Sequence, residues 1–196
     1  MTVMRQIEDW HVGIPAGWGS WFPHEAARTA DQVAAALGVN PAAQARVRES
    51  VMTLDATVGT GMILSAAVWV PDASTGEPCG FLQVELLGVE TTREASAEEY
   101  LHAVSSRRQR RGVKVFDHST SLTDTDAGPA VIEVLVTAER RSRQVISGIV
   151  WTVFPPGSNQ AVRLEFTTPI PAMFEALSTQ SVVIARSTVL TLTSSA

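Results

Sequence analysis

The chain has 196 residues, of which 45% are hydrophobic and 18% are charged, and its formal net charge is −5. This apolar content is enough for a compact core and excludes the disordered, coiled-coil and collagen-like classes of protein. The acidic balance argues against a general nucleic-acid binder, because such a protein needs a basic face to displace counterions from phosphates.

The first part of the chain predicts a short strand and a helical hairpin. Apolar residues within residues 5–14 are spaced mostly by two, which is typical of a strand, and a Pro/Gly turn follows. Apolar side chains then recur at helical spacing until Gly38, where the first helix ends. Asn40 and Pro41 suit the N-cap and the first position of a second helix. We therefore expect two helices over about residues 23–58.

The middle of the chain predicts a β-hairpin and a third helix. Continuous apolar runs at residues 62–70 and 80–87 flank a turn-rich loop. Ser96 and Glu99 have the spacing of a capping box, which begins a helix. We expect this helix to end in the arginine run of residues 107–111, because cations suit the negative end of the helix dipole.

The last part of the chain predicts strands and a final helix. Apolar runs indicate three strands, at residues 131–137, 145–154 and 161–166. A helix follows Pro169 and runs to about Ser187, and the β-rich tail of residues 188–193 is either its end or a short strand. Short connections favour antiparallel pairing. The pattern predicts a single α+β domain over residues 1–196, with helices packed on an antiparallel sheet.

The C-terminal third resembles a known family. The strand Ala161–Phe166, the Thr-Thr-Pro turn after it, and a helix with Phe174, Leu177 and Ser181 on one face resemble the end of PsbP-like domains. The resemblance covers about residues 110–187. It implies an α/β/α sandwich and a non-enzymatic scaffold that binds other proteins.

Two N-terminal features bear on this resemblance. The segment from Trp10 to Trp18 is similar to the family's N-terminal strand pair. The helical hairpin is longer than the family leads us to expect, which leaves the strand order open.

Residues able to carry catalysis are isolated in the sequence. The four histidines, His11, His24, His102 and His118, lack metal-ligand spacing and are interpreted as surface residues. The single cysteine, Cys79, is interpreted as a small, unreactive apolar residue. The segment from Asp124 to Gly128 lacks the distal ligands of a calcium loop and predicts a polar turn. We expect no catalytic residue, metal or cofactor.

Two arginine clusters are the first candidate binding site. Together they hold seven of the fifteen cationic residues: Arg107, Arg108, Arg110, Arg111, Arg140, Arg141 and Arg143. If the clusters are adjacent in space, they form a patch suited to phosphate or to an acidic surface of a protein partner. The alternative is a solvated helix end and a solvated turn.

The second candidate is a short aromatic segment. Trp18, Trp21 and Phe22 lie close together among glycine, serine and proline residues. Aromatic residues in such a setting often mark interfaces. The alternative is that they cover the edge of the sheet as part of the core.

The leading hypothesis is a non-enzymatic protein-binding or adaptor domain. The alternative is a small-ligand-binding protein or an enzyme that uses a cleft between the helical hairpin and the sheet. A further hypothesis is a homodimer through an exposed sheet edge or the Trp18/Trp21 surface. The lone cysteine and the lack of a long apolar segment predict a cytoplasmic protein without a membrane span. One lysine beside fourteen arginines suggests a bacterium with a high-GC genome.

Overall fold

A seven-stranded antiparallel sheet forms the centre of the computed structural model, which describes residues 4–58, 61–88, 95–105, 113–139 and 144–193. Its strands, in spatial order, are β2 (Trp18–Trp21), β3 (Ile63–Trp69), β4 (Gly80–Gly88), β8 (Gln160–Thr168), β7 (Val145–Val153), β6 (Gly128–Glu139) and β5 (Val113–Thr125). Every neighbouring pair in this order is antiparallel. The predicted α+β class is therefore correct.

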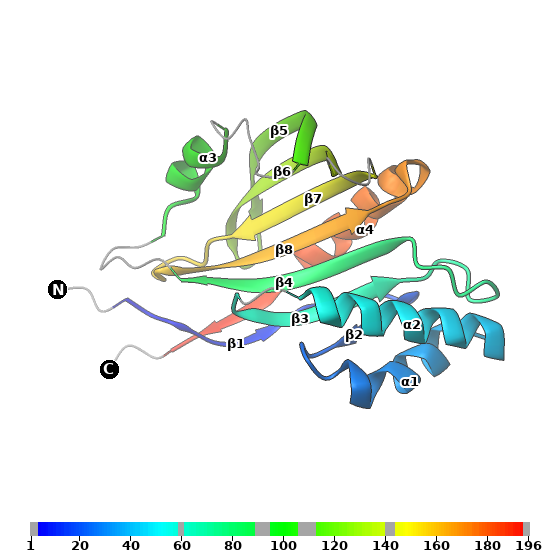
Figure 1. The fold of residues 1–196 in the computed structure, drawn as a ribbon. Coiled ribbons are helices and arrows are strands. Elements are labelled where there is room, and N and C mark those ends of the chain that lie inside the picture. Colours follow the sequence, from blue (N-terminus) through cyan, green and yellow to red (C-terminus); the bar gives the residue numbers. More distant parts are fainter. Residues whose placement is uncertain (1–3, 59–60, 89–94, 106–112, 140–143, 194–196) are drawn as a thin grey trace.

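One face of the sheet packs on the last helix. The helix α4 (Phe174–Arg186) follows the short 3₁₀ turn η1 (Pro171–Met173) and lies behind the strands in Figure 1. Leu177 and Ile184 on α4 are fully buried against sheet residues such as Phe166. Because side chains alternate along a strand, the even-numbered residues of β8 face α4 and the odd-numbered ones face away from it.

The opposite face is covered at its two ends by different helices. The hairpin of α1 (Ala26–Leu37) and α2 (Pro41–Thr57) packs on β3, whereas α3 (Ala97–Ser105) packs on β5 and β6 (Figure 1). The Asn40 side chain accepts the N–H of Ala43, as its predicted N-cap position requires. The middle of this face, between the hairpin and α3, carries the polar side chains described below.

The two ends of the chain meet in a separate two-stranded sheet. In it β1 (Ile7–His11) pairs antiparallel with β9 (Val189–Leu192), so the tail after α4 is a strand. The family resemblance suggested a strand pair in the N-terminal segment. The two strands found there, β1 and β2, do not pair with each other. β2 pairs with β3, where Trp18 stacks on Trp69.

Two strands of the sheet were missing from the sequence interpretation. β2 lies in the aromatic segment that we had not assigned to a strand, and the first helix begins at Ala26. β5 is polar on both faces, so it lacks the apolar alternation that indicates a half-buried strand. No helix in the described part of the chain is long and apolar enough to cross a membrane.

Candidate functional site

A cavity of about 210 Å³ lies between α2 and the sheet, and we call it the hairpin cleft. Leu54, Thr57 and Val58 from the end of α2 form one wall. The sheet contributes apolar and polar residues to the lining, among them Phe81, Gln83, Glu165 and Thr167. A mostly apolar enclosure with a few polar groups is the usual composition of a ligand pocket, although this volume is small for one.

A row of three charged side chains continues the floor of the hairpin cleft. Arg163 Nη1 lies 3.2 Å from Glu85 Oε2, and Nη2 lies 2.7 Å from Glu165 Oε2. Burial alone would lower the pKa of Arg163, but Glu165, Tyr100 and Glu85 raise it above its usual value. One guanidinium thus serves two carboxylates, and the row carries one net negative charge.

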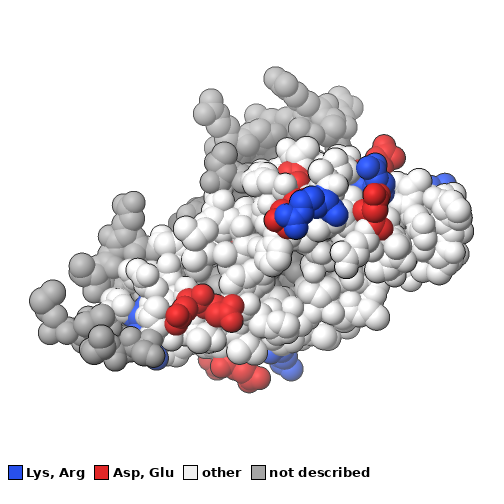
Figure 2. Space-filling model, turned by 90° about the horizontal axis from the view of Figure 1, so that it is seen from below, with Lys and Arg blue, Asp and Glu red and all other residues white. Residues whose placement is uncertain are grey.

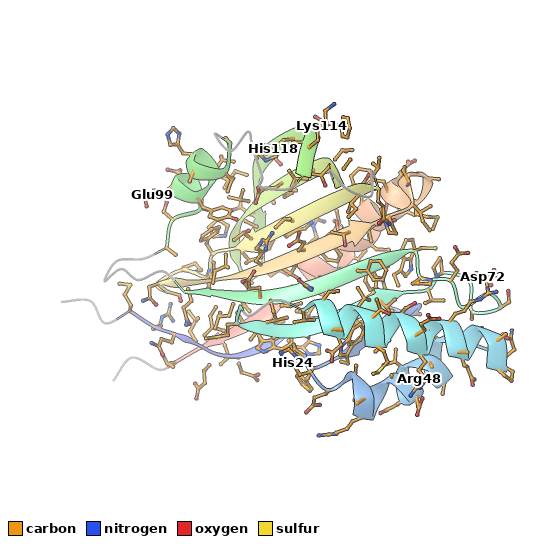
Figure 3. All side chains as sticks on the ribbon, viewed as in Figure 1. His24, Arg48, Asp72, Glu99, Lys114 and His118 are labelled. Carbon is orange, nitrogen blue, oxygen red and sulfur yellow. The ribbon has the colours of Figure 1, made fainter. Side chains whose placement is uncertain are left out.

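A second polar cluster lies under α3. Glu133 is 3% exposed, and one of its oxygens accepts a hydrogen bond of 3.2 Å from the Tyr100 hydroxyl. Its other oxygen lies 3.6 Å from His118 Nε2, so β5 and β6 both contribute to the cluster (Figure 3). Burial and the Glu133 charge raise the pKa of Tyr100 above its ordinary value. The cluster holds α3 on the sheet by a buried polar contact.

A larger groove of about 510 Å³ lies between β1 and β2, and we call it the edge groove. Its lining includes Asp9 to Val12 on one side and Ser20 to Phe22 on the other. Consecutive residues of a strand point to opposite faces, so a groove on one face would be lined by every second residue. Here consecutive residues line the groove, which indicates that the edges of the strands border it. Among the described residues β1 pairs only with β9 and β2 only with β3, which leaves one edge of each strand unpaired.

The edge groove is aromatic and largely uncharged. Phe22 is 61% exposed and Trp10 is half-buried, and both line the groove. The backbone N–H of Trp10 donates to Asp9 Oδ1 at 2.8 Å, so an adjacent side chain occupies this donor of β1. The side of the molecule seen from below in Figure 2 is mostly uncharged, with acidic and basic residues in a few small groups.

Both predicted interface tryptophans are buried. Trp18 is 6% exposed, stacks on Trp69 at 6.0 Å and meets Phe166 edge-on. Trp21 is 4% exposed, and its indole N–H donates to Asp55 Oδ1 at 3.0 Å. Trp21 lines both the hairpin cleft and the edge groove. The exposed aromatic side chain of this segment is Phe22.

The arginine clusters of residues 107–111 and 140–143 lie outside the described residues. The strands that flank them are described. Val113 at the start of β5 is the Cα partner of Glu139 at the end of β6. Ala138 pairs in turn with Val145, where β7 begins. The chain positions that flank both clusters therefore lie at one end of the same three strands.

The remaining candidates for chemistry are mostly far from one another in the described part of the chain. No group of three or more histidine, cysteine or acidic residues in the described ranges could hold a metal ion. Burial, and then the charge of Glu77, raises the pKa of the Cys79 thiol, which disfavours a reactive thiolate. His118 is the exception, because its 14% exposed side chain lies against Glu133. The surface interpretation of His118 was wrong because β5 was not recognised as a strand.

Comparisons with known proteins identify the fold. No family model and no curated protein matches the chain. Cyanobacterial PsbP (CyanoP) from Synechocystis matches with a TM-score of 0.52 and 7% identity, over 97% of this chain and 94% of that chain. LpqN of Mycobacterium tuberculosis, a protein involved in cell envelope biogenesis, matches with a TM-score of 0.50 and 13% identity, over 93% of this chain and 83% of that chain. The chain has a PsbP-like fold.

The PsbP-like fold was therefore predicted correctly from the C-terminal third of the sequence. Identities of 7% and 13% transfer no binding residue from these structures to the present chain. Candidate sites in this chain accordingly rest on its own geometry. The hairpin cleft and the edge groove both have linings of described residues, and Trp21 contributes to both.

Proposed function

We propose that the protein is a non-enzymatic partner-binding domain that holds an extended segment of another protein in the edge groove. The observation that carries this proposal is the position of Phe22, 61% exposed at a groove of about 510 Å³ bordered by two unpaired strand edges. A bound segment would pair its backbone with a strand edge and bury an apolar side chain against Phe22 and Trp10. Aromatic anchors of this kind contribute much of the binding energy at interfaces.

The PsbP-like fold supports a scaffold function. One neighbour, LpqN, is described as involved in cell envelope biogenesis, and its name gives no catalytic activity. The cytoplasmic location that we predicted from the sequence has no support among these neighbours. The proposal therefore concerns the binding surface and leaves the compartment to be measured by cell fractionation.

The test compares two exposed apolar residues. Val39, 72% exposed at the turn between α1 and α2, lies outside the lining of the edge groove and serves as the control for Phe22. Wild type, Val39→Ser and Phe22→Ser are used for quantitative affinity capture from the native cell. The proposal expects proteins that wild type and Val39→Ser recover and Phe22→Ser loses at least tenfold. Identical recovery by all three variants would exclude the edge groove.

We also propose that the two arginine clusters contact an acidic surface of the same partner. The strand ends that flank them share one end of β5, β6 and β7, which supports a joint patch. Reversing the charge of Arg107, Arg108, Arg110 and Arg111, or of Arg140, Arg141 and Arg143, should weaken capture. Reversing both clusters should weaken it by less than the sum of the two effects if the clusters act together. If the losses of capture from the two reversals simply add, the two clusters act independently and do not form a joint patch.

Small-ligand binding in the hairpin cleft is a second candidate function. The observation that favours it is the convergence of Gln83, Glu165 and Thr167 on an apolar enclosure beside α2. A metabolite screen by thermal shift tests it, with Gln83→Leu as the variant that removes a polar group from the floor. The decisive outcome is a ligand that raises the melting temperature of wild type but not of Gln83→Leu, while affinity capture recovers no specific protein partner. Ligand binding would then be the function in place of partner binding.

A further inference from the structure

The edge of the sheet farthest from the edge groove is a long exposed strand. β5 has 13 residues, and among the described residues it pairs only with β6. Phe116 is 56% exposed and Leu122 is 47% exposed on this strand. Such an edge presents unpaired backbone N–H and C=O groups to any strand that approaches it.

The first part of β5 carries two features that protect an edge strand against such pairing. The register with β6 shifts between Val115 and Asp117, so Phe116 is the extra residue of a β-bulge. Lys114 lies over the Phe116 ring at 4.7 Å, which places a cation at the same point. Bulges and lysines are the usual means by which edge strands avoid pairing. Residues 117–125 carry no bulge, lysine or proline and keep a regular register with β6.

We propose that a second copy of the protein pairs antiparallel with residues 117–125 of β5, about a two-fold axis at Ser121. In a continuous sheet, residues directly opposite each other point to the same face. Because side chains alternate along a strand, two opposite residues must then be an even number of positions apart in the sequence. The two-fold axis therefore passes through a residue and not between two residues. An axis at Ser121 uses all nine regular residues. With an axis at Ser119, only five residues can pair before the bulge interrupts the register. With an axis at Thr123, only five residues can pair before the strand ends at the hairpin turn.

The side chains agree with this register. Ser119 stands opposite Thr123 of the second copy, and Asp117 stands opposite Thr125. His118 stands opposite Asp124, and Thr120 opposite Leu122. No like charges face each other, and hydroxyl pairs are favourable cross-strand neighbours. β5 and β2 form opposite edges of the sheet, so this dimer leaves the edge groove free.

A pair of cysteine variants tests the register. In a Cys79→Ser background, Ser121→Cys places the two thiols directly opposite each other, about 5 Å apart at Cα, within disulfide reach. Ser119→Cys is the matched control on the same face, because its two copies lie four residues apart along the strands, roughly 13 Å. Mild oxidation should convert Ser121→Cys to a covalent dimer and leave Ser119→Cys monomeric. Equal cross-linking of both variants, or of neither, would overturn the proposed register.

Sedimentation equilibrium of the unmodified protein provides a second measurement. Wild type and the control Thr53→Lys, exposed on α2, should rise in mass with concentration from 21.0 kDa towards twice that value. The double variant Ser119→Lys/Ser121→Lys adds cations to the unguarded edge and should stay at 21.0 kDa. A wild-type protein that stays at 21.0 kDa over the whole concentration range would exclude the dimer.

Discussion

Asp55 shows how a single residue shapes both cavities. Its Oδ1 accepts the Trp21 indole N–H at 3.0 Å and the backbone N–H of His24 at 2.8 Å. Its Oδ2 accepts the N–H of Ala26, the first residue of α1, at 3.4 Å. One carboxylate thus holds Trp21, which lines both cavities, and also the turn at His24, whose φ is +64°.

We expect Asp55→Ala to destabilise the protein by about 3 kcal/mol, because several donors lose a charged acceptor and the indole N–H is buried. Asp31→Ala removes an exposed carboxylate that forms a surface ion pair with Arg48, and should cost less than about 1 kcal/mol. Urea unfolding monitored by tryptophan fluorescence measures both. Similar losses for the two variants would contradict the role assigned to Asp55.

Tyr100 provides a pH-dependent prediction, because it is the only tyrosine of the chain. Burial raises the pKa of its phenol above the ordinary value of 10.0 in the folded protein. The folded state therefore keeps the proton at a pH where the unfolded state loses it. The free energy of unfolding should be insensitive to this group below pH 10 and fall as the pH rises above that value.

Ultraviolet difference absorbance of the phenolate reports on Tyr100 alone and gives its titration midpoint directly. The alkaline loss of stability should be smaller in Tyr100→Phe, which removes the titrating group and keeps the ring against Phe154. A midpoint at or below 10.0 in the folded protein would refute the prediction.

At the scale of elements, α4 is attached to the sheet by a few fully buried side chains. Leu177 and Ile184 are 0% exposed, and Trp151 on β7 donates to the Ser181 hydroxyl of α4 at 3.2 Å. Gly80 on β4 leaves room for this helix, because a Cβ there would lie 2.9 Å from Leu177 Cδ1. The apolar face predicted from helical spacing is therefore the face that packs.

We expect Leu177→Ala to destabilise the protein by about 3 kcal/mol, through lost burial and the cavity that remains. Val183→Ala on the same helix, where the side chain is 51% exposed, should change stability by no more than about 0.5 kcal/mol. Chemical unfolding of the two variants checks the difference. Equal effects would mean that α4 does not dock as described.

At the scale of the whole molecule, the two chain ends stabilise each other. Thr193 donates its N–H to the Gln6 carbonyl, and the Ser187 hydroxyl accepts the N–H of Gly13. Ile7 and Trp10 of β1 and Leu190 of β9 pack against the main core. One border of the edge groove therefore depends on a strand at the other end of the sequence.

Deletion of residues 189–196 removes β9 and should expose β1. We expect amide hydrogen exchange in β1 to become at least about tenfold faster, while the central strands β7 and β8 keep their protection. Deletion of residues 194–196 alone is the control. Unchanged exchange in β1 after the longer deletion would show that β9 does not hold it.

Local sequence signals determined much of the fold. The helices of the hairpin, the capped start of α3, the strands with continuous apolar runs and the final helix follow from the periodicity and capping of neighbouring residues. The PsbP-like fold followed from the C-terminal residues, although the single-domain interpretation stays a prediction. These features depend on residues a few positions apart, which a sequence presents directly.

The sites were decided by tertiary structure. β5 and β2 are edge strands. They form because they pair with β6 and β3, and not because their own sequences alternate between apolar and polar residues. The hairpin cleft joins α2 to β8, and the edge groove joins β1 to β2 with β9 behind it. Net charge and composition argued against general nucleic-acid binding, which stays a prediction. They could not place Phe22 at a groove or leave residues 117–125 at an open edge, because both depend on contacts between segments far apart in the chain.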